Sequence, residues 1–249
     1  MKGKSNIIDW GNSMMLKRAI YHILWMGKNI NLALYIYLNY FCKSVNREKK
    51  YHIFPYRRTR IRIRSNAEII LNGDLRINAH QGDKRFARSY LSMHKNSKLF
   101  IGGFVTLGQG SIIVVNENAV LEFMGKVTSN INLAIGCQQL IRIGNDTMIG
   151  SDVTIFDTDF HPTEYPNNEF CVHTSPVCIG EHVWIGTRAM IMKGSNIGTG
   201  SIIGANAYFA GNLPANTLVS CIPSRTVLKD VKWARDMSSE SIENARIYV

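Results

Sequence analysis

A bulky aliphatic residue recurs at every sixth position through the second half of the chain. The series begins and then, after an interruption, resumes in the same register, at Ile143, Ile149, Ile155, Ile179, Ile185, Ile191, Ile197, Ile203 and Phe209. Glycine directly follows six of these nine positions, at residues 144, 150, 180, 186, 198 and 204. Fainter series of the same period occur upstream, at Ile63, Ile69 and Leu75, at Ile101, Leu107 and Ile113, and at Val115, Leu121, Val127 and Leu133. The repeat therefore covers residues 60–222.

A six-residue unit is too short to bury its own aliphatic side chain, so successive units must stack on one another. Short, flat strands that meet at tight corners place every sixth side chain in one central column. We expect glycine to supply the backbone conformations that these corners require. Strands of an ordinary β-sandwich would instead alternate with a period of two. The pattern thus predicts an all-β solenoid.

This pattern resembles that of the hexapeptide-repeat acyltransferases. The resemblance implies a left-handed parallel β-helix of triangular cross-section, with three repeats in each coil. We expect this domain to span residues 59–222. A basic, amphipathic helical arm is predicted before it, over residues 1–58, and a helical tail that caps the last coil is predicted over residues 223–249.

The series is interrupted by a polar, proline-containing segment that must loop out, and we place this loop at residues 156–178. It contains His161 together with Asp157 and Asp159. An imidazole held by a carboxylate is a general base that works near neutral pH. The residues alone also fit a solvent-exposed loop histidine, or one that caps a turn.

The segments 157–162 and 176–186 resemble the active-site loop and the next coil of hexapeptide O-acetyltransferases, and those that act on cell-surface polysaccharides and sugars are the most similar. The resemblance implies that His161 removes the proton from an acceptor hydroxyl, which attacks the thioester of acetyl-CoA directly. Asp157 or Asp159 would orient the imidazole and stabilise its protonated form.

The same resemblance implies a homotrimer whose donor groove runs between neighbouring subunits. Trp184 would line the acceptor or pantetheine channel. Small residues would allow acetyl-CoA to approach closely, namely Gly186, Ala189, Gly204 and Ala205, although coil packing alone also requires small residues. Arg225 lies in a segment similar to the family's Gly-Asn-Pro-Ala-Lys/Arg ending and would reach the nucleotide phosphates.

The chain departs from the family pattern at two places. Cys221 and Ile222 replace the usual Gly and Asn, and residues 210–211, Ala-Gly, replace a frequent Thr-Lys pair. These changes put one phosphate or pantetheine contact in doubt. Lys193 or Arg188 could compensate, or both could be solvated corner residues.

The net charge of +11 is concentrated at one end of the chain. Residues 1–64 contain 14 Lys and Arg and two acidic residues, whereas residues 65–249 contain 15 Lys and Arg and 16 acidic residues. Residues 14–41 have the composition of an amphipathic helix, which suits either an anionic membrane surface or packing against the body or a neighbouring subunit. Nucleic acid is disfavoured, because the arm has no recognition motif and the body offers no second basic face.

The longest apolar run, residues 32–38, is too short to span a bilayer. The first residues lack the features of a secretory signal, and the five cysteines are scattered. We therefore expect a protein of the reducing cytoplasm, placed at the inner face of the membrane if the arm binds lipid.

The favoured function is an acetyl-CoA-dependent O-acetyltransferase that modifies a sugar hydroxyl of a surface glycan or its precursor. Two alternatives stay open: an acetyltransferase for a small free acceptor (a sugar, amino sugar or antibiotic), and a non-catalytic hexapeptide scaffold. The scaffold would not need residues 157–161. No metal is expected, because the spacing of His161, His173 and His182 does not match that of a zinc hydratase on the same fold.

Overall fold

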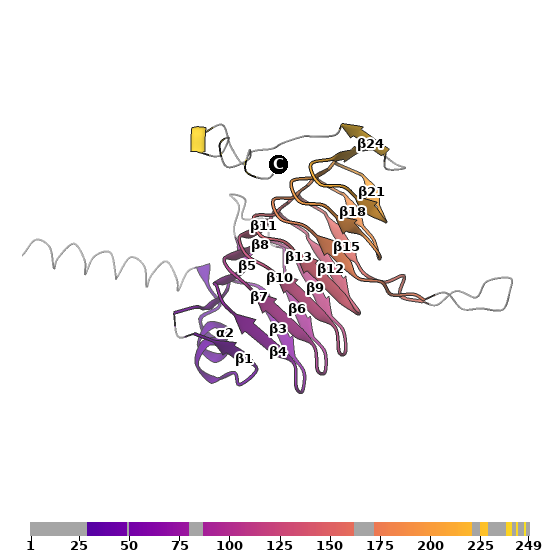
Figure 1. Ribbon diagram of the computed structural model, residues 1–249. Helices are drawn as coiled ribbons and strands as arrows, with labels where there is room; N and C mark the ends of the chain where they lie inside the picture. The colour runs from indigo at the N-terminus through magenta and orange to yellow at the C-terminus, as the bar shows by residue number, and fades with distance from the viewer. Residues whose placement is uncertain are drawn as a thin grey trace, which may run out of the picture.

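The computed structural model describes residues 29–48, 50–79, 87–161, 172–220 and 225–228, together with residues 238–240, 243 and 247. Its strands form three sheets, and the chain visits the sheets in rotation, so that each coil contributes one strand to each side of a triangular solenoid (Figure 1). All strand pairs are parallel except the last, in which β24 is antiparallel to β23.

The first sheet contains β1 (Val45–Arg47), β4 (Glu68–Leu71), β7 (Lys98–Ile101), β10 (Val120–Phe123), β13 (Leu140–Ile143), β16 (Val177–Ile179), β19 (Asn196–Ile197) and β22 (Asn212–Leu213). The second contains β2 (Ile53–Pro55), β5 (Leu75–Ala79), β8 (Val105–Gly108), β11 (Val127–Ser129), β14 (Met148–Ile149), β17 (Trp184–Ile185), β20 (Ile202–Ile203), β23 (Leu218–Ser220) and β24 (Arg225–Leu228). The third contains β3 (Thr59–Ile63), β6 (Ser89–Met93), β9 (Ile112–Val115), β12 (Ala134–Cys137), β15 (Thr154–Phe156), β18 (Met190–Ile191) and β21 (Tyr208–Phe209).

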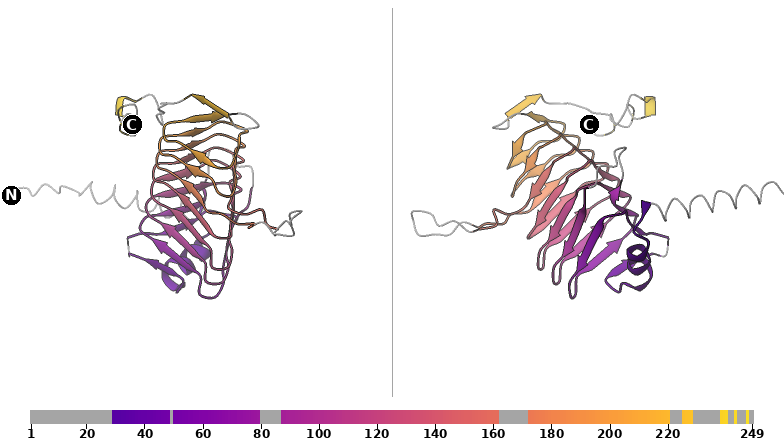
Figure 2. Two further views of the ribbon diagram at one scale, coloured as in Figure 1. Left: turned by 45° about the vertical axis from the view of Figure 1, so that its right-hand side comes forward. Right: turned by 180° about the vertical axis from the view of Figure 1, so that it is seen from behind.

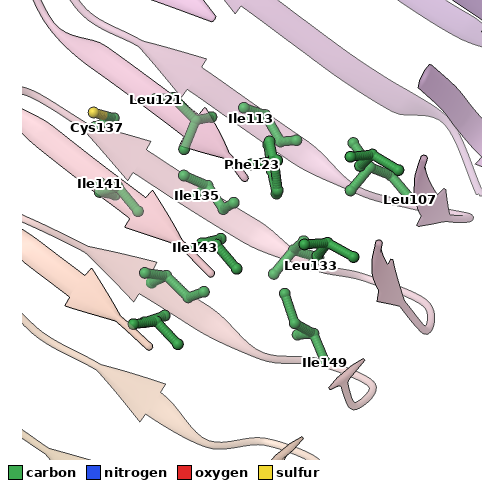
Figure 3. Close-up of a cluster of buried hydrophobic side chains, with 14 of the residues drawn as sticks. Leu107, Ile113, Leu121, Phe123, Leu133, Ile135, Cys137, Ile141, Ile143 and Ile149 are labelled. Carbon is green, nitrogen blue, oxygen red and sulfur yellow. The ribbon is translucent and has the colours of Figure 1, made fainter. Parts of the chain in front are cut away.

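The period-six aliphatic side chains fill the interior of this solenoid. All nine residues of the main series, from Ile143 to Phe209, are buried. The strand register stacks equivalent side chains, so that Phe123 lies opposite Ile143 and Ile143 opposite Ile179. Figure 3 shows part of this column, with side chains from successive coils pointing into one core. The predicted fold class is therefore observed, and the interruption of the repeat does not break the stack.

The glycines of the repeat have a different role from the one predicted. Those that follow the aliphatic positions do not have a positive φ; the corner residues that do are mostly Asn and Asp. A Cβ on Gly150 would lie 2.7 Å from the backbone nitrogen of Thr187, and a Cβ on Gly186 would lie 2.6 Å from that of Ala205. These glycines are thus required because the next coil packs directly against them.

Two of the predicted domain boundaries are wrong. The predicted arm, residues 1–58, includes β1 and β2, which pair with β4 and β5 and already belong to the solenoid. The predicted helical tail, residues 223–249, includes the strand β24. β1 and β2 precede the first recognised period-six series, which begins at Ile63, so the sequence pattern does not include them. The rest of the tail, apart from a few residues, and residues 1–28 of the arm lie outside the described part of the chain.

A short helical segment covers the N-terminal end of the solenoid, at the opposite end from β24 (Figure 2). It consists of the α-helix α2 (Leu32–Ile36) and the π-helical turn η1 (Tyr37–Phe41). Leu38 enters the core cluster. The Asn39 amide donates to the Ile53 carbonyl at 2.8 Å and accepts from the Ile53 amide at 2.9 Å. In this region the predicted arm therefore packs on the body. No helix in the described ranges is long and apolar enough to cross a membrane.

Candidate functional site

The interrupting loop leaves the solenoid between β15 and β16. Its two described arms, residues 157–161 and 172–176, run antiparallel to each other and away from the body (Figure 1). The Asp159 amide donates to the His173 carbonyl at 2.8 Å, and the Ser175 amide donates to the Asp157 carbonyl at 3.0 Å. The base of the loop is therefore a paired ribbon.

Asp157 is fully buried at the point where the loop begins. One carboxylate oxygen accepts from the Gln138 amide at 2.7 Å, and the other accepts from the amides of Gln139 and Leu140, both at 2.8 Å. These three donors form the corner turn of the preceding coil, between β12 and β13. Asp157 thus anchors the first residue of the loop to the adjacent coil, with its charge held by backbone N–H groups.

The Cys137 thiol lies beside the same carboxylate, with its sulfur 3.6 Å from an Asp157 oxygen. Burial, followed by the charge of Asp157 and the hydrogen bond to it, raises the pKa of the Cys137 thiol far above its usual range. The thiol therefore stays protonated and is not a nucleophile.

Asp159 forms an ion pair on the outgoing arm with Lys193, at 2.5 Å between Asp159 Oδ2 and Lys193 Nζ. The same ammonium donates to the Val172 carbonyl on the returning arm at 2.8 Å. Lys193 lies between β18 and β19, at the same corner one coil beyond the loop. A single cation therefore fixes both arms. The sequence offers Lys193 either as a compensating phosphate or pantetheine contact or as a solvated corner residue, and no sequence motif indicates its contact with the loop.

Aromatic packing shapes the last described residues before the loop tip. Phe160 has φ 64°, in the left-handed region, which is uncommon for a bulky residue. Its amide donates to the Thr158 hydroxyl at 2.8 Å, and its ring meets that of Phe156 edge to face at 5.1 Å between centroids. This constrained conformation determines where the chain places the next residue, His161.

His161 is exposed at the end of this arm. The structure records no hydrogen bond from its imidazole to Asp157, to Asp159 or to any other described residue. Both carboxylates instead hold the loop that carries His161. Among the described residues, the arrangement is thus an exposed imidazole on an arm that is anchored to the coils on both sides.

Trp184 does not lie beside His161 within one chain. It is on β17 in the second sheet, with its side chain 42% exposed on the outer face. The loop leaves from the corner between the third and first sheets, which is the corner opposite the second sheet of the triangle. Within the described part of the chain, the two residues therefore lie on different sides of the solenoid.

The predicted donor positions fall into two groups. Gly186 and Ala189 are buried, so their small size serves coil packing. Gly204 is half-buried and Ala205 is exposed, at the corner between the second and third sheets. These two positions leave the corner without bulky side chains. The backbone of Arg225 lies in β24, on the second-sheet side, and its side chain is outside the described part of the structure.

His182, in the coil that follows the loop, pairs with an aspartate. His182 is buried at a corner with φ 51°, and its Nδ1 lies 2.6 Å from Asp146 Oδ2. Lys126 lies 3.5 Å from the other oxygen of Asp146. The sequence did not reveal this pair, because its two members are 36 residues apart. Among the described residues, no group of three His, Cys, Asp or Glu side chains is arranged to hold a metal ion.

Residues 179–211 match the family model of the bacterial transferase hexapeptide (six repeats). A protein of Escherichia coli (strain K12), whose name assigns it to lipopolysaccharide biosynthesis as an O-acetyl transferase, is 28% identical over 154 residues, which are 58% of this chain and 79% of that protein. The galactoside O-acetyltransferase of the same organism is 32% identical over 102 residues, which are 40% of this chain and 49% of that enzyme. The chain thus spans only about half the length of this second relative.

Among solved structures, the polysialic acid O-acetyltransferase OatWY superposes with a TM-score of 0.64 and 21% identity, over 80% of this chain and 91% of that chain. At this identity the likeness concerns the fold. The comparisons confirm the predicted left-handed parallel β-helix and the predicted resemblance to hexapeptide-repeat acyltransferases. The predicted enzyme class, an O-acetyltransferase, is the class named for these relatives.

Proposed function

We propose that this chain is an acetyltransferase that moves an acetyl group from acetyl-CoA to a sugar hydroxyl of a surface glycan or its precursor, with His161 as the general base. The O-acetyltransferases named above have names that mention lipopolysaccharide biosynthesis, a galactoside and polysialic acid. We place the enzyme in the cytoplasm, where acetyl-CoA is made and used.

The observation that carries the proposal is the exposed His161 on a loop anchored to the coils on both sides. Asp157 fixes the start of the loop to the preceding coil, and Lys193 fixes both arms to the following one. A protein that used the solenoid only for assembly would gain nothing from holding an exposed imidazole in this way. The geometry therefore favours catalysis over the scaffold interpretation.

In the proposed reaction, His161 accepts the proton of the acceptor hydroxyl as its oxygen attacks the acetyl thioester carbonyl. The imidazolium then returns that proton to the departing sulfur, so the transfer is direct and leaves no acetyl group on the protein. Asp157 and Asp159 act as positioning residues, because each holds the loop and neither contacts the imidazole.

The donor site is proposed to lie between two copies of the chain in a homotrimer. Trp184, Gly204 and Ala205 lie on or beside the second sheet, and the loop is on the opposite corner. A neighbouring subunit that presented its second sheet to this loop would bring an exposed indole and two small residues to His161. Arg225 would then be close to the nucleotide end of acetyl-CoA.

Calorimetric titration of the purified protein with acetyl-CoA tests the donor before the acceptor is known. Saturable binding near one molecule per subunit supports the transferase, and its absence up to millimolar concentration would favour the scaffold. Release of free coenzyme thiol is then measured with glycan acceptors and with free sugars, amino sugars and antibiotics. His161→Ala is expected to lower turnover by a factor of about 100 or more while leaving acetyl-CoA binding unchanged. Substantial turnover by this variant would remove His161 from the mechanism.

A further inference from the structure

The outer side of the N-terminal cap, residues 32–41, is apolar. Five side chains on this side are between 42% and 70% exposed, namely Leu32, Ile36, Tyr37, Tyr40 and Phe41. Successive members of this set are four, one, three and one residues apart, which places them on one side of the helical segment. The elements that end a solenoid normally present a polar outer face. The apolar outer side of the cap is therefore a candidate docking surface.

The exposure of these side chains does not come from a cap that is poorly packed. The opposite side of the segment contributes Leu38 to the core, and Asn39 is held by two hydrogen bonds to Ile53. The segment is therefore fixed with its apolar side outward.

Two hollows lie beside the cap, and each is lined by two arginines. One hollow, of about 450 Å³, lies at the start of α2 and is lined by Arg57 and Arg58. The second, of about 500 Å³, lies beside Tyr37 and is lined by Arg60 and Arg62, which alternate along β3 and are both exposed. Among the residues that the structure describes, no acidic one lines either hollow. The apolar face is thus bordered by positive charge.

We propose that the cap docks on the surface of an anionic bilayer. The five apolar side chains would enter the boundary between headgroups and acyl chains, where aromatic residues are favoured, while the arginines would contact lipid phosphates. A bilayer offers an apolar layer directly beneath a negative surface, which matches the order of apolar and positive groups on the cap.

Other occupants fit this surface less well because of charge. A second copy that docked through the same face would bring arginines against arginines. Residues 1–28 of the chain itself hold five Lys and Arg and one acidic residue, so they too carry the same sign. The proposal concerns where the protein sits and does not depend on the proposed acetyl transfer.

The test measures sedimentation of the full-length protein with vesicles of phosphatidylcholine alone and of phosphatidylcholine mixed with phosphatidylglycerol. The cap variant is Tyr40→Ser with Phe41→Ser, and the matched control is Met124→Ser with Ile131→Ser, two exposed apolar residues away from the cap. A charge variant replaces Arg60 and Arg62 by Gln. All variants retain residues 1–28.

We expect binding only to the vesicles that contain phosphatidylglycerol. The cap variant should bind about tenfold more weakly, and the charge variant about 25-fold more weakly at low salt, from roughly fivefold for each guanidinium. The control should bind like the wild type. Acetyl-CoA binding should be unchanged in all of them, which separates this proposal from the failure of the transferase proposal.

Three results would overturn docking through the cap. Equal binding by wild type and cap variant would locate any lipid contact elsewhere, for example in residues 1–28. Loss in the charge variant with no loss in the cap variant would indicate an anion site without bilayer insertion. A changed oligomeric state of the cap variant in ultracentrifugation, with vesicle binding unaltered, would make the cap a contact between copies.

Discussion

The role of Asp157 can be tested by replacing it with asparagine, which keeps the shape and removes the charge. The carboxylate accepts one N–H from Gln138 and two from Gln139 and Leu140. In its better orientation, the introduced carboxamide would still accept the second pair and turn its NH₂ group toward the Gln138 N–H. The partly buried Gln138 N–H then faces another donor and has no acceptor, at a cost of about 1–3 kcal/mol. The two remaining bonds lose their charge-assisted part, about 0.5–1 kcal/mol each.

Release of the buried carboxylate from its desolvation offsets part of this loss. We therefore expect Asp157→Asn to destabilise the corner by about 3 kcal/mol, which corresponds to roughly 100-fold faster hydrogen exchange at residues 138–140. Asp152→Asn is the matched control, because Asp152 accepts a side-chain hydrogen bond from Asn132 at an exposed corner; it should change stability by less than about 0.5 kcal/mol.

Exchange by mass spectrometry of peptides that cover residues 137–141 provides the measurement. Wild-type protection in Asp157→Asn would refute the assigned role in the turn. Wild-type protection together with a lower turnover and an altered pH profile would show that Asp157 acts on His161 instead, as a catalytic partner.

Lys193→Met should lower turnover at least tenfold, with less than about 1 kcal/mol of stability lost because the ion pair is partly exposed. In kinetic assays, Lys193→Arg should retain more activity than Lys193→Met, and adding Asp159→Asn to Lys193→Met should lower turnover little further. Additive losses of activity would contradict a shared role of the two residues. Because the folded state raises the pKa of the Cys137 thiol, the unfolded chain ionises first, so stability should be constant below the ordinary thiol pKa and fall as pH rises above it. Denaturant unfolding at pH 7 and pH 10 should show that the free energy of unfolding falls less between these pH values for Cys137→Ala than for the wild type. An equal fall in both proteins would exclude this thiol as the cause. Gly186→Ala should destabilise by about 1–3 kcal/mol, because its Cβ would meet the Ala205 nitrogen at 2.6 Å. Thermal unfolding, monitored by circular dichroism, should show a lowered melting temperature for Gly186→Ala and an unchanged one for the control Ala205→Ser, at an exposed position. An unchanged melting temperature for Gly186→Ala would show that the two coils can move apart to accept the methyl group.

The sequence is sufficient to predict the solenoid, because the core needs a bulky apolar side chain at every sixth position. Each aliphatic from Ile143 to Phe209 must reach the same column, and any change of register would expose it. The start of the solenoid was not predictable in this way. β1 and β2 lie before the first period-six series, and only their pairing with β4 and β5 shows that they belong to the solenoid.

The residues of the candidate site could be predicted from the sequence, but their hydrogen-bond and ion-pair partners could not. His161 and its neighbouring carboxylates stand together in the sequence, yet the partners of Asp157 and Asp159 come from the coils before and after the loop. Those partners are backbone amides at 138–140 and Lys193, none of which has a local signature. Side-chain pairing between coils depends on three-dimensional register, which one sequence does not display.

The regular stacking of strands gives the solenoid a fixed height. In the third sheet, β3 lies beside the cap and β15 carries the loop, with β6, β9 and β12 between them. At about 4.8 Å per strand, the root of the loop lies about 19 Å along the axis from the cap. With the cap on a bilayer and the axis upright, the solenoid becomes a rigid spacer. Under the proposed acetyl transfer, the enzyme would favour acceptor hydroxyls held at that height above the bilayer, and adding or deleting one coil would move the favoured height by one strand spacing.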